Sequence, residues 1–311
     1  MKIRQTFQKF LLATALGTSL IVTTSSCDKD DDTAPAAKNI TEIVSSDPNF
    51  SLLKSAVIKA GLADALSTGT LTVFAPDDAA FAAAGITSAT INSLSAADLA
   101  NLLTYHVVAA NVKAANVPVS DTVKTLQGKN LYASRNANGV FVNGSKVKSA
   151  DITAANGTIH VISTVLTPPT KTIAQLAAET PTLSRLLTAV VKAGLAGAVS
   201  GPGKYTVFAP TNDAFAAAGF PTDASINSAD AAAVTGIVTA HVLPTTVFSS
   251  DLIAGSTANT IKTGTSLTIG LTPPSVKITG SANAVSNIIL PSGVNIIATN
   301  GVVHLIDKVL Q

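Results

Sequence analysis

Histidine is the residue type in this chain best suited to metal binding or acid–base chemistry, and the 311 residues contain four. The first two, His106 and His160, lie 54 positions apart, and His241 and His304 lie 63 positions apart. A local metal site usually places its ligands a few residues apart, as in H-x-x-x-H, and neither such a spacing nor a neighbouring carboxylate accompanies these histidines. The sequence therefore predicts no metal and no cofactor. It favours buried histidines that hydrogen-bond to the backbone or to nearby Asp and Asn residues.

The single cysteine, Cys27, ends an N-terminal segment that has the features of an export signal. Residues 1–9 are basic, residues 10–22 form a mostly apolar run of 13 residues, and small residues fill 23–26. That run is shorter than the roughly 20 residues that span a membrane, and it fits the apolar core of a signal peptide. The segment resembles a bacterial lipoprotein signal, which implies a signal peptide at 1–26, lipidation of Cys27 and membrane attachment through that lipid. The alternative is an ordinary secreted protein with an unpaired cysteine.

Four aspartates and one lysine occupy residues 28–32, directly after Cys27. Like charges at this density cannot pack against one another, so we expect residues 27–38 to form a solvated acidic tether and linker. The tract also resembles the acidic signal that carries some lipoproteins of Bacteroidota to the outer face of the outer membrane. We therefore expect a protein anchored in the outer membrane and exposed at the cell surface. A periplasm-facing or secreted protein is the alternative.

The composition of the chain excludes several broad classes of protein. A hydrophobic fraction of 47% with only 12% charged residues excludes a charge-rich disordered protein. The formal net charge is +2, and the chain has neither a Lys- and Arg-rich run nor a basic stripe with aromatic residues, so we expect no nucleic-acid partner. One cysteine can form neither an internal disulfide nor a Cys-based zinc site.

An internal repeat organises the rest of the chain. Residues 56–86 recur at 189–220, LLTYHVV recurs as IVTAHVL, and NGTIHVISTVL recurs as NGVVHLIDKVL. The spacing between the copies grows from 133 to 135 and then to 144, which predicts an insertion of about nine residues in the second copy, around 287–295. Two copies of one unit predict two domains, at 39–167 and 168–311.

The repeated segments carry a recognisable family pattern. TVFAPDDAAF, LLTYHVV and GTIHVISTVL, in this order, resemble the three signature segments of fasciclin domains, and TVFAPTNDAF, IVTAHVL and GVVHLIDKVL repeat them. The resemblance covers nearly the whole chain after residue 38. It implies two tandem fasciclin-like domains of the α+β class, each a compact β-wedge of mainly antiparallel strands with helices packed around it.

The spacing of apolar residues predicts helices first and strands later in the first copy. Apolar positions 52, 53, 56 and 57 share one face of a helix, which predicts a helix within 51–62 that has Gly61 as its C-terminal glycine. Residues 71–74 are typical of a short buried strand. Residues 124–152 alternate apolar and polar side chains around turns that contain Gly and Asn, which predicts antiparallel hairpins. Helices mixed with antiparallel strands agree with the α+β class.

Asp77 and Asp78 form the most plausible pair of catalytic carboxylates, but the second copy has Thr211 and Asn212 at these positions. Residues at the start of a helix are typical N-caps, which accept hydrogen bonds from free backbone N–H groups and complement the helix dipole. The chain also lacks a G-x-S-x-G elbow, a Gly-rich phosphate loop and an H-E-x-x-H motif. We therefore expect no catalytic residues and no enzymatic activity.

The family resemblance implies two groups of site residues. The segment around Tyr105 and His106 is implicated in adhesion in animal relatives, although Ala240 replaces the tyrosine in the second copy. For Tyr105 itself we favour a mainly structural role. The candidate adhesion surface consists of Leu102, Leu103, Tyr105, His106, Val107 and Val108. The signature residues expected to be structural are Phe74, Pro76, Asp77, Phe81, His160, Phe208, Pro210, Thr211, Phe215, His241 and His304.

These features favour an envelope lipoprotein that acts in adhesion, or in contact with an extracellular matrix or another surface. Two weak sites on one tether gain avidity, which favours this hypothesis. The partner is then a protein or a glycan at the cell surface. The alternative is a binding module for a small apolar ligand or a glycan that serves an envelope system. A purely structural envelope protein is a third hypothesis.

Overall fold

The computed structural model describes residues 36–272, 275–280 and 285–310. The chain after Ala36 forms one compact unit, to which all the helices and strands below belong. Cys27, the predicted signal peptide and most of the predicted tether lie outside the described residues. Within the described part, no helix is both long enough and apolar enough to cross a membrane.

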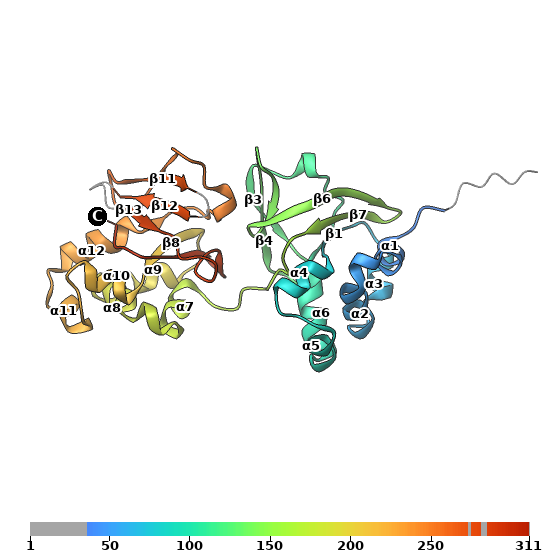
Figure 1. Ribbon diagram of the computed structural model, residues 1–311, viewed down its shortest axis with the longest axis horizontal. Coiled ribbons are helices and arrows are strands. Elements are labelled where there is room, and N and C mark those ends of the chain that lie inside the picture. Colours follow the sequence, from blue (N-terminus) through green and yellow to red (C-terminus); the bar gives the residue numbers. More distant parts are fainter. Residues whose placement is uncertain (1–35, 273–274, 281–284, 311) are drawn as a thin grey trace, which may run out of the picture. The chain divides into compact units, whose positions relative to one another are not determined.

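The elements fall into two sets with the same order, helices first and strands later, which we call the first and second repeats (Figure 1). The helices of the first repeat are α1 (Ile40–Ser46), α2 (Ser51–Lys59), α3 (Ala63–Ser67), α4 (Asp78–Ala83), α5 (Ser88–Ser93) and α6 (Ala96–Tyr105). Its strands are β1 (Leu71–Pro76), β2 (Val107–Val108), β3 (Ser120–Lys124), β4 (Asn130–Asn136), β5 (Gly139–Val142), β6 (Ser145–Ala154) and β7 (Gly157–Ile162).

The second repeat contains helices α7 to α12 and strands β8 to β15. Its helices are α7 (Ile173–Glu179), α8 (Ser184–Lys192), α9 (Ala196–Ser200), α10 (Asn212–Ala217), α11 (Asp223–Ser228) and α12 (Ala231–Ala240). Its strands are β8 (Tyr205–Pro210), β9 (Val242–Leu243), β10 (Thr257–Asn259), β11 (Ser266–Thr272), β12 (Ser275–Thr279), β13 (Val285–Asn287), β14 (Ile296–Ala298) and β15 (Gly301–Ile306). Short 3-10 helices lie at Pro48–Phe50, Ala114–Asn116, Pro181–Leu183 and Ser249–Asp251.

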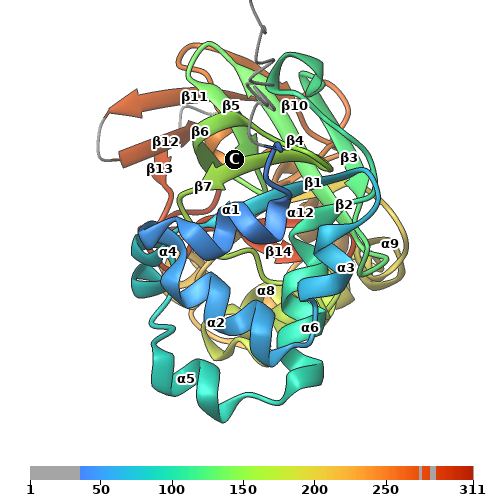
Figure 2. The ribbon, with the colours of Figure 1, turned by 90° about the vertical axis from the view of Figure 1, so that its right-hand side faces the viewer.

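The strands of the first repeat form a seven-stranded sheet in the order β2-β1-β7-β6-β5-β4-β3. Neighbouring strands are antiparallel except β1 and β7, which pair in parallel from Leu71 opposite Gly157 to Pro76 opposite Ile162. Figures 1 and 2 both show α2, α5 and α6 grouped at one end of this repeat and β3, β4 and β6 at the other.

The second repeat keeps the parallel pairing but divides its strands between two sheets. The sheet β14-β15-β8-β9 contains the parallel pair, in which Gly301 lies opposite Tyr205, and the sheet β10-β11-β12-β13 is antiparallel throughout. An isolated bridge between Ile288 and Ile306 connects the region after β13 to β15. The predicted α+β class, with helices packed on mainly antiparallel strands, is confirmed.

Strand β1 is buried along its whole length because both of its faces are covered. Val73 and Ala75 pack with Phe81 in the core beneath the helices. Phe74 points the other way and packs with Leu131 in a second core between the strands. The corresponding residues of β8 are Val207 and Ala209 on the helix side and Phe208 on the strand side.

Helix α2 ends at Lys59, with Ala60 as its C-cap, and Gly61 follows as the predicted C-terminal glycine. Gly61 has a φ of +68°, a left-handed conformation in which L side chains are strained. The Gly61 N–H donates to the Ile58 carbonyl, and the Leu62 N–H donates to the Val57 carbonyl, which is the Schellman pattern that ends a helix.

The predicted insertion in the second repeat is distributed over several places. Val142 pairs with Ser145 in the first repeat, but the corresponding Ile278 pairs with Ser286, so this connection is five residues longer in the second repeat. The chain from Ile288 to Asn295 corresponds to the stretch of β6 from Val147 to Asp151. It is three residues longer. Only part of the insertion therefore lies at 287–295. The rest is tolerated elsewhere because a longer connection between paired positions costs little free energy.

An Asn–Gly pair closes the parallel pairing in each repeat. The Asn156 side chain accepts from the Ile40 N–H (2.9 Å) and donates to the Leu66 carbonyl (3.0 Å), which ties two helices to the start of β7. Gly157 then has a φ of +151°, and a Cβ there would lie 1.8 Å from the Leu71 carbonyl oxygen. The second repeat uses Asn300 and Gly301 in the same way, where a Cβ would lie 2.0 Å from a backbone oxygen.

We expect Gly157→Ala to lower the free energy of unfolding by more than about 2 kcal/mol, because the added methyl group overlaps the backbone of β1. Gly69→Ala is the matched control, since Gly69 also has a positive φ (+77°) but no atom within 4 Å of the added Cβ. Denaturant unfolding of the two variants measures the difference. Equal losses would show that conformational strain, and not the close strand approach, sets the requirement for glycine.

Candidate functional site

His106 and His241 occupy the C-terminal ends of α6 and α12 and are almost completely buried. The Nδ1 atom of His106 lies 2.8 Å from the Leu102 carbonyl, and its Nε2 atom accepts from the Leu166 N–H at 2.8 Å. His241 repeats both contacts, with the Ile237 carbonyl and the Leu310 N–H, each at 2.8 Å. Each histidine thus ties the end of a helix to the segment that follows the last strand.

His160 and His304 lie in β7 and β15, and each stacks on a phenylalanine of the parallel partner strand. The ring centroids are 5.5 Å apart for His160 and Phe74, and 5.6 Å apart for His304 and Phe208. The Nε2 atom of His160 lies 2.8 Å from the Val112 carbonyl, and its Nδ1 atom accepts from a backbone N–H at 3.2 Å. His304 makes the matching contacts at 2.9 and 3.2 Å.

All four imidazoles are held in the neutral form. Burial lowers the pKa of His106, His241 and His304 from 6.5 to about 4, and it lowers the pKa of His160 as well. In each ring, one nitrogen faces a backbone carbonyl and must carry the proton. The other nitrogen accepts a hydrogen bond from a backbone N–H and must be unprotonated. Their lone pairs are therefore used within the protein. Among the described residues, no three side chains of the His, Cys, Asp and Glu types gather as a metal ion requires.

The candidate adhesion surface, Leu102 to Val108, lies mainly in the core. Of its six residues, five have exposed fractions of 4% or less: Leu103, Tyr105, His106, Val107 and Val108. Leu102 is half-buried. A partner that contacts the folded chain cannot reach the five buried side chains, so these residues do not form an exposed adhesion surface. Their apolar types and the internal bonds of His106 explain the burial.

Tyr105 has a polar partner inside the core. Its hydroxyl donates to the Asn130 carbonyl (3.1 Å) and accepts from the Asn143 side chain (2.9 Å). Burial raises the pKa of Tyr105 to about 12. The side-chain oxygen of Asn143 accepts from the Tyr132 N–H, so Tyr105 connects α6 to β4 and to the turn after β5. The second repeat has the buried Ala240 instead and lacks this connection.

The two adjacent aspartates serve two different helices. Asp77 accepts from the Ala80 N–H (2.8 Å) at the start of α4, and its other oxygen lies 2.7 Å from the Lys148 ammonium. Asp78 points to the start of α2, where it accepts from the Ser51 hydroxyl (2.6 Å) and the Leu52 N–H (2.9 Å). The pair therefore shares no cleft. In the second repeat, Thr211 caps α10, and Asn212 bonds to the start of α8.

The remaining signature residues also lie in or against the core. Phe81 and Phe215 are 1% exposed, and Phe74 and Phe208 are stacked on histidines. Pro76 and Pro210 end the buried strands β1 and β8.

Four further polar residues of the two cores were not predicted from the sequence: Asn156, Asn300, Thr72 and Thr206. Each threonine is completely buried, donates to one backbone carbonyl and accepts from one backbone N–H. The signal that could have found all four residues is their identity in both copies at positions where polar side chains interrupt apolar runs.

Two pairs of aliphatic side chains are exposed at corresponding positions of the repeats. Ile58 and Val191 are 63% and 61% exposed on α2 and α8. Leu126 and Ile261 are 46% and 37% exposed, and their N–H groups donate to the carbonyls of Val107 and Val242, each at 2.8 Å. The loops that carry Leu126 and Ile261 therefore cover the buried β2 and β9 strands and present aliphatic side chains outward.

We expect the free energy of unfolding to fall as the pH drops from 7 to 5. The pKa of a buried histidine is lower in the folded chain than in the unfolded chain, so protonation of the unfolded state begins near pH 6.5 while the folded state stays neutral until about pH 4. Each such histidine contributes a slope of up to about 1.4 kcal/mol per pH unit in this window. Denaturant unfolding at pH 7, 6 and 5 measures the slope, and His106→Gln should reduce it. A flat profile would contradict the neutral, buried histidines.

Comparison with known proteins assigns the fold to a family. The fasciclin domain model matches residues 48–168 and 181–311. The transforming growth factor-beta-induced protein ig-h3 of Sus scrofa is 29% identical over 246 residues, which cover 78% of this chain and 35% of that protein. The protein sll1483 of Synechocystis is 42% identical over 139 residues, which cover 43% of this chain and 76% of that protein. The chain thus spans about a third of the length of ig-h3.

A solved pair of FAS1 domains from the insect cell adhesion molecule Fasciclin I is also similar. It matches 84% of this chain and 96% of its own chain, with a TM-score of 0.43 and 20% sequence identity. The two family matches together cover most of the sequence, one on each repeat. The chain therefore belongs to the fasciclin-domain family and contains two such domains in tandem.

Proposed function

We propose that this chain is a cell-envelope lipoprotein that mediates adhesion, or contact with an extracellular matrix or another surface, through its two fasciclin domains. Family membership supports the general role, since fasciclin domains occur in cell adhesion proteins. The partner is a protein or a glycan at the cell surface.

The observation that carries this proposal is the exposed aliphatic pair Leu126 and Ile261. Single exposed aliphatic residues are common on protein surfaces, but these two occupy the same position in both domains and lie over the buried β2 and β9 strands. The contact surface then consists of the covering loops, and not of the buried Tyr–His segment. Two such weak contacts on one chain strengthen attachment by avidity.

The proposed anchor is the lipid on Cys27, and the acidic residues that follow it supply a solvated tether. A single tether that carries two domains lets both of them reach the same partner surface. We place the protein at the outer face of the outer membrane. A periplasm-facing anchor or secretion without a lipid are the outcomes that the tests below distinguish.

We expect cells that carry the Leu126→Lys, Ile261→Lys double variant to attach to one another or to a coated surface several-fold less than cells with the parent chain. Each lysine replaces an aliphatic contact with a hydrated charge, and the exposed positions leave the fold intact. Val119→Lys is the control, because Val119 is 73% exposed in the first domain and Ala254 stands at the corresponding place. Unchanged attachment in the double variant, and in a chain without residues 39–311, would contradict the proposal.

We expect labelled palmitate to be incorporated into the parent chain and lost in Cys27→Ala, because Cys27 is the only thiol available for lipidation. Protease treatment of intact cells should then digest the domains of the parent chain. Absence of label would favour the secreted alternative, and label with full protease protection would favour a periplasm-facing anchor.

A further inference from the structure

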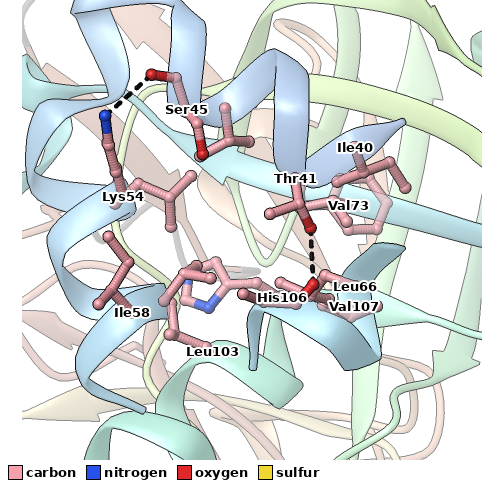
Figure 3. Close-up of a pocket in the computed structure, with 15 residues that line it drawn as sticks. Ile40, Thr41, Ser45, Lys54, Ile58, Leu66, Val73, Leu103, His106 and Val107 are labelled. Atoms are coloured by element: carbon pink, nitrogen blue, oxygen red, sulfur yellow. Dashed lines mark hydrogen bonds between the residues drawn. The ribbon is translucent and has the colours of Figure 1, made fainter. Parts of the chain in front are cut away.

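The first domain contains an apolar cavity of about 60 Å³ between helices α1, α2, α3 and α6 and strand β1 (Figure 3). Its floor consists of buried side chains. Among them are Val44, Val57, Leu66, Val73, Leu103 and His106. Both nitrogens of His106 are already bonded to the backbone, so the floor offers no free polar group from this residue. A cavity with such a lining stays dry and favours an apolar occupant.

The rim of the cavity is different in character, because it carries polar and cationic groups. Thr41 is half-buried, and Ser45, Lys54 and Ile58 are exposed. The Lys54 ammonium donates to the Ser45 carbonyl at 3.1 Å, and within the described part of the chain no carboxylate lies within salt-bridge distance of it. Figure 3 shows Lys54 and Ser45 side by side at one edge of the cavity and His106 in its depth.

The second domain supplies an internal comparison. A cavity in the same place, lined by Ile173, Ala177, Val190 and His241 among others, has a volume of only about 20 Å³. The positions that correspond to Thr41, Ser45 and Lys54 hold Ala174, Ala178 and Leu187. The larger volume and the polar, cationic rim therefore occur together in the first domain, and both are missing from its copy.

We propose that the first-domain cavity binds a short aliphatic carboxylic acid, with the hydrocarbon chain in the cavity and the carboxylate at the Lys54 ammonium. The volume is less than half of the roughly 150 Å³ that holds a benzene ring, so it suits a branched chain of a few carbons and excludes a ring. A carboxylate suits the rim because it pairs with an ammonium and accepts from the nearby Ser45 hydroxyl. This site is separate from the Leu126 and Ile261 loops, so it does not depend on the proposed role in adhesion.

Methyl NMR tests this proposal on the compact unit that begins at Ala37. The probe is 3-methylbutanoate, and 3-methylbutan-1-ol is the uncharged control of similar shape. We expect saturable shifts of the methyl groups of Val44, Val57 and Leu66, with tighter binding of the acid than of the alcohol. The corresponding second-domain methyl groups should not shift. Absence of saturable shifts in the first domain would overturn the proposal. Equal binding of acid and alcohol would overturn the role of Lys54.

Two variants make the assignment specific. Lys54→Leu introduces the residue of the second domain and should weaken acid binding about three- to fivefold while it leaves alcohol binding unchanged. Val44→Ile fills part of the cavity and should weaken the binding of both probes about tenfold. Lys124→Leu, which removes an exposed lysine that does not line the cavity, is the charge-matched control and should bind like the parent chain. Acid binding unaffected by both Lys54→Leu and Val44→Ile would overturn the proposal.

Discussion

The parallel pairing between an early strand and the last long strand of each domain is the constraint on which the rest of the structure depends. It brings β1 next to β7, and β8 next to β15, across at least 80 residues of intervening chain. A parallel pair in the middle of a fold is covered on both faces, and here helices lie on one side and strands on the other. Gly157 and Gly301 allow the two backbones to approach closely enough for the pairing to begin.

The four histidines secure this pairing with bonds that apolar residues cannot make. His160 and His304 connect the last strand to the loop after the short second strand, and His106 and His241 connect the end of a helix to the chain after that last strand. An unsatisfied polar group in such a core costs about 1–3 kcal/mol, so all partners must be present together. The most recognisable residues of the family therefore work inside each domain.

Because these residues are used inside each domain, contact with a partner must come from the surface, and a ligand specific to one domain must come from the differences between the two. The exposed Leu126 and Ile261 are common to both domains, which suits a contact that gains from repetition. The cavity near Lys54 has its polar rim in one domain alone, which suits a ligand that binds once per chain. Duplication has thus kept the core nearly constant while the rims and loops have changed.

Much of the fold could be predicted from the sequence because the repeat appears twice. The order of helices and strands and the caps at Asp77 and Thr211 follow from local patterns. The burial of Tyr105 and Val107 follows from their apolar character and agrees with the structural role favoured for Tyr105. The insertion could be placed only in part, since residues added between two paired positions leave no local signal in the sequence, and Ile278 and Ser286 pair only in three dimensions.

The cavity could not be predicted from the sequence, for a related reason. Its lining residues are the same aliphatic types that fill any core, and only the arrangement of α1, α2 and α3 leaves room between them. Lys54 has no distinguishing neighbour in the sequence, and its place on the rim is a consequence of helix packing.

Nitrogen NMR of the imidazole rings at pH 7 tests the central claim, that the signature histidines are neutral and bonded within the core. The account predicts a proton on Nδ1 of His106 and His241 and on Nε2 of His160 and His304, each as a single fixed tautomer. Rings that exchange between tautomers, or that carry both protons at this pH, would contradict the account. Such rings would be accessible to solvent, and these residues would again be candidates for direct contact with a partner.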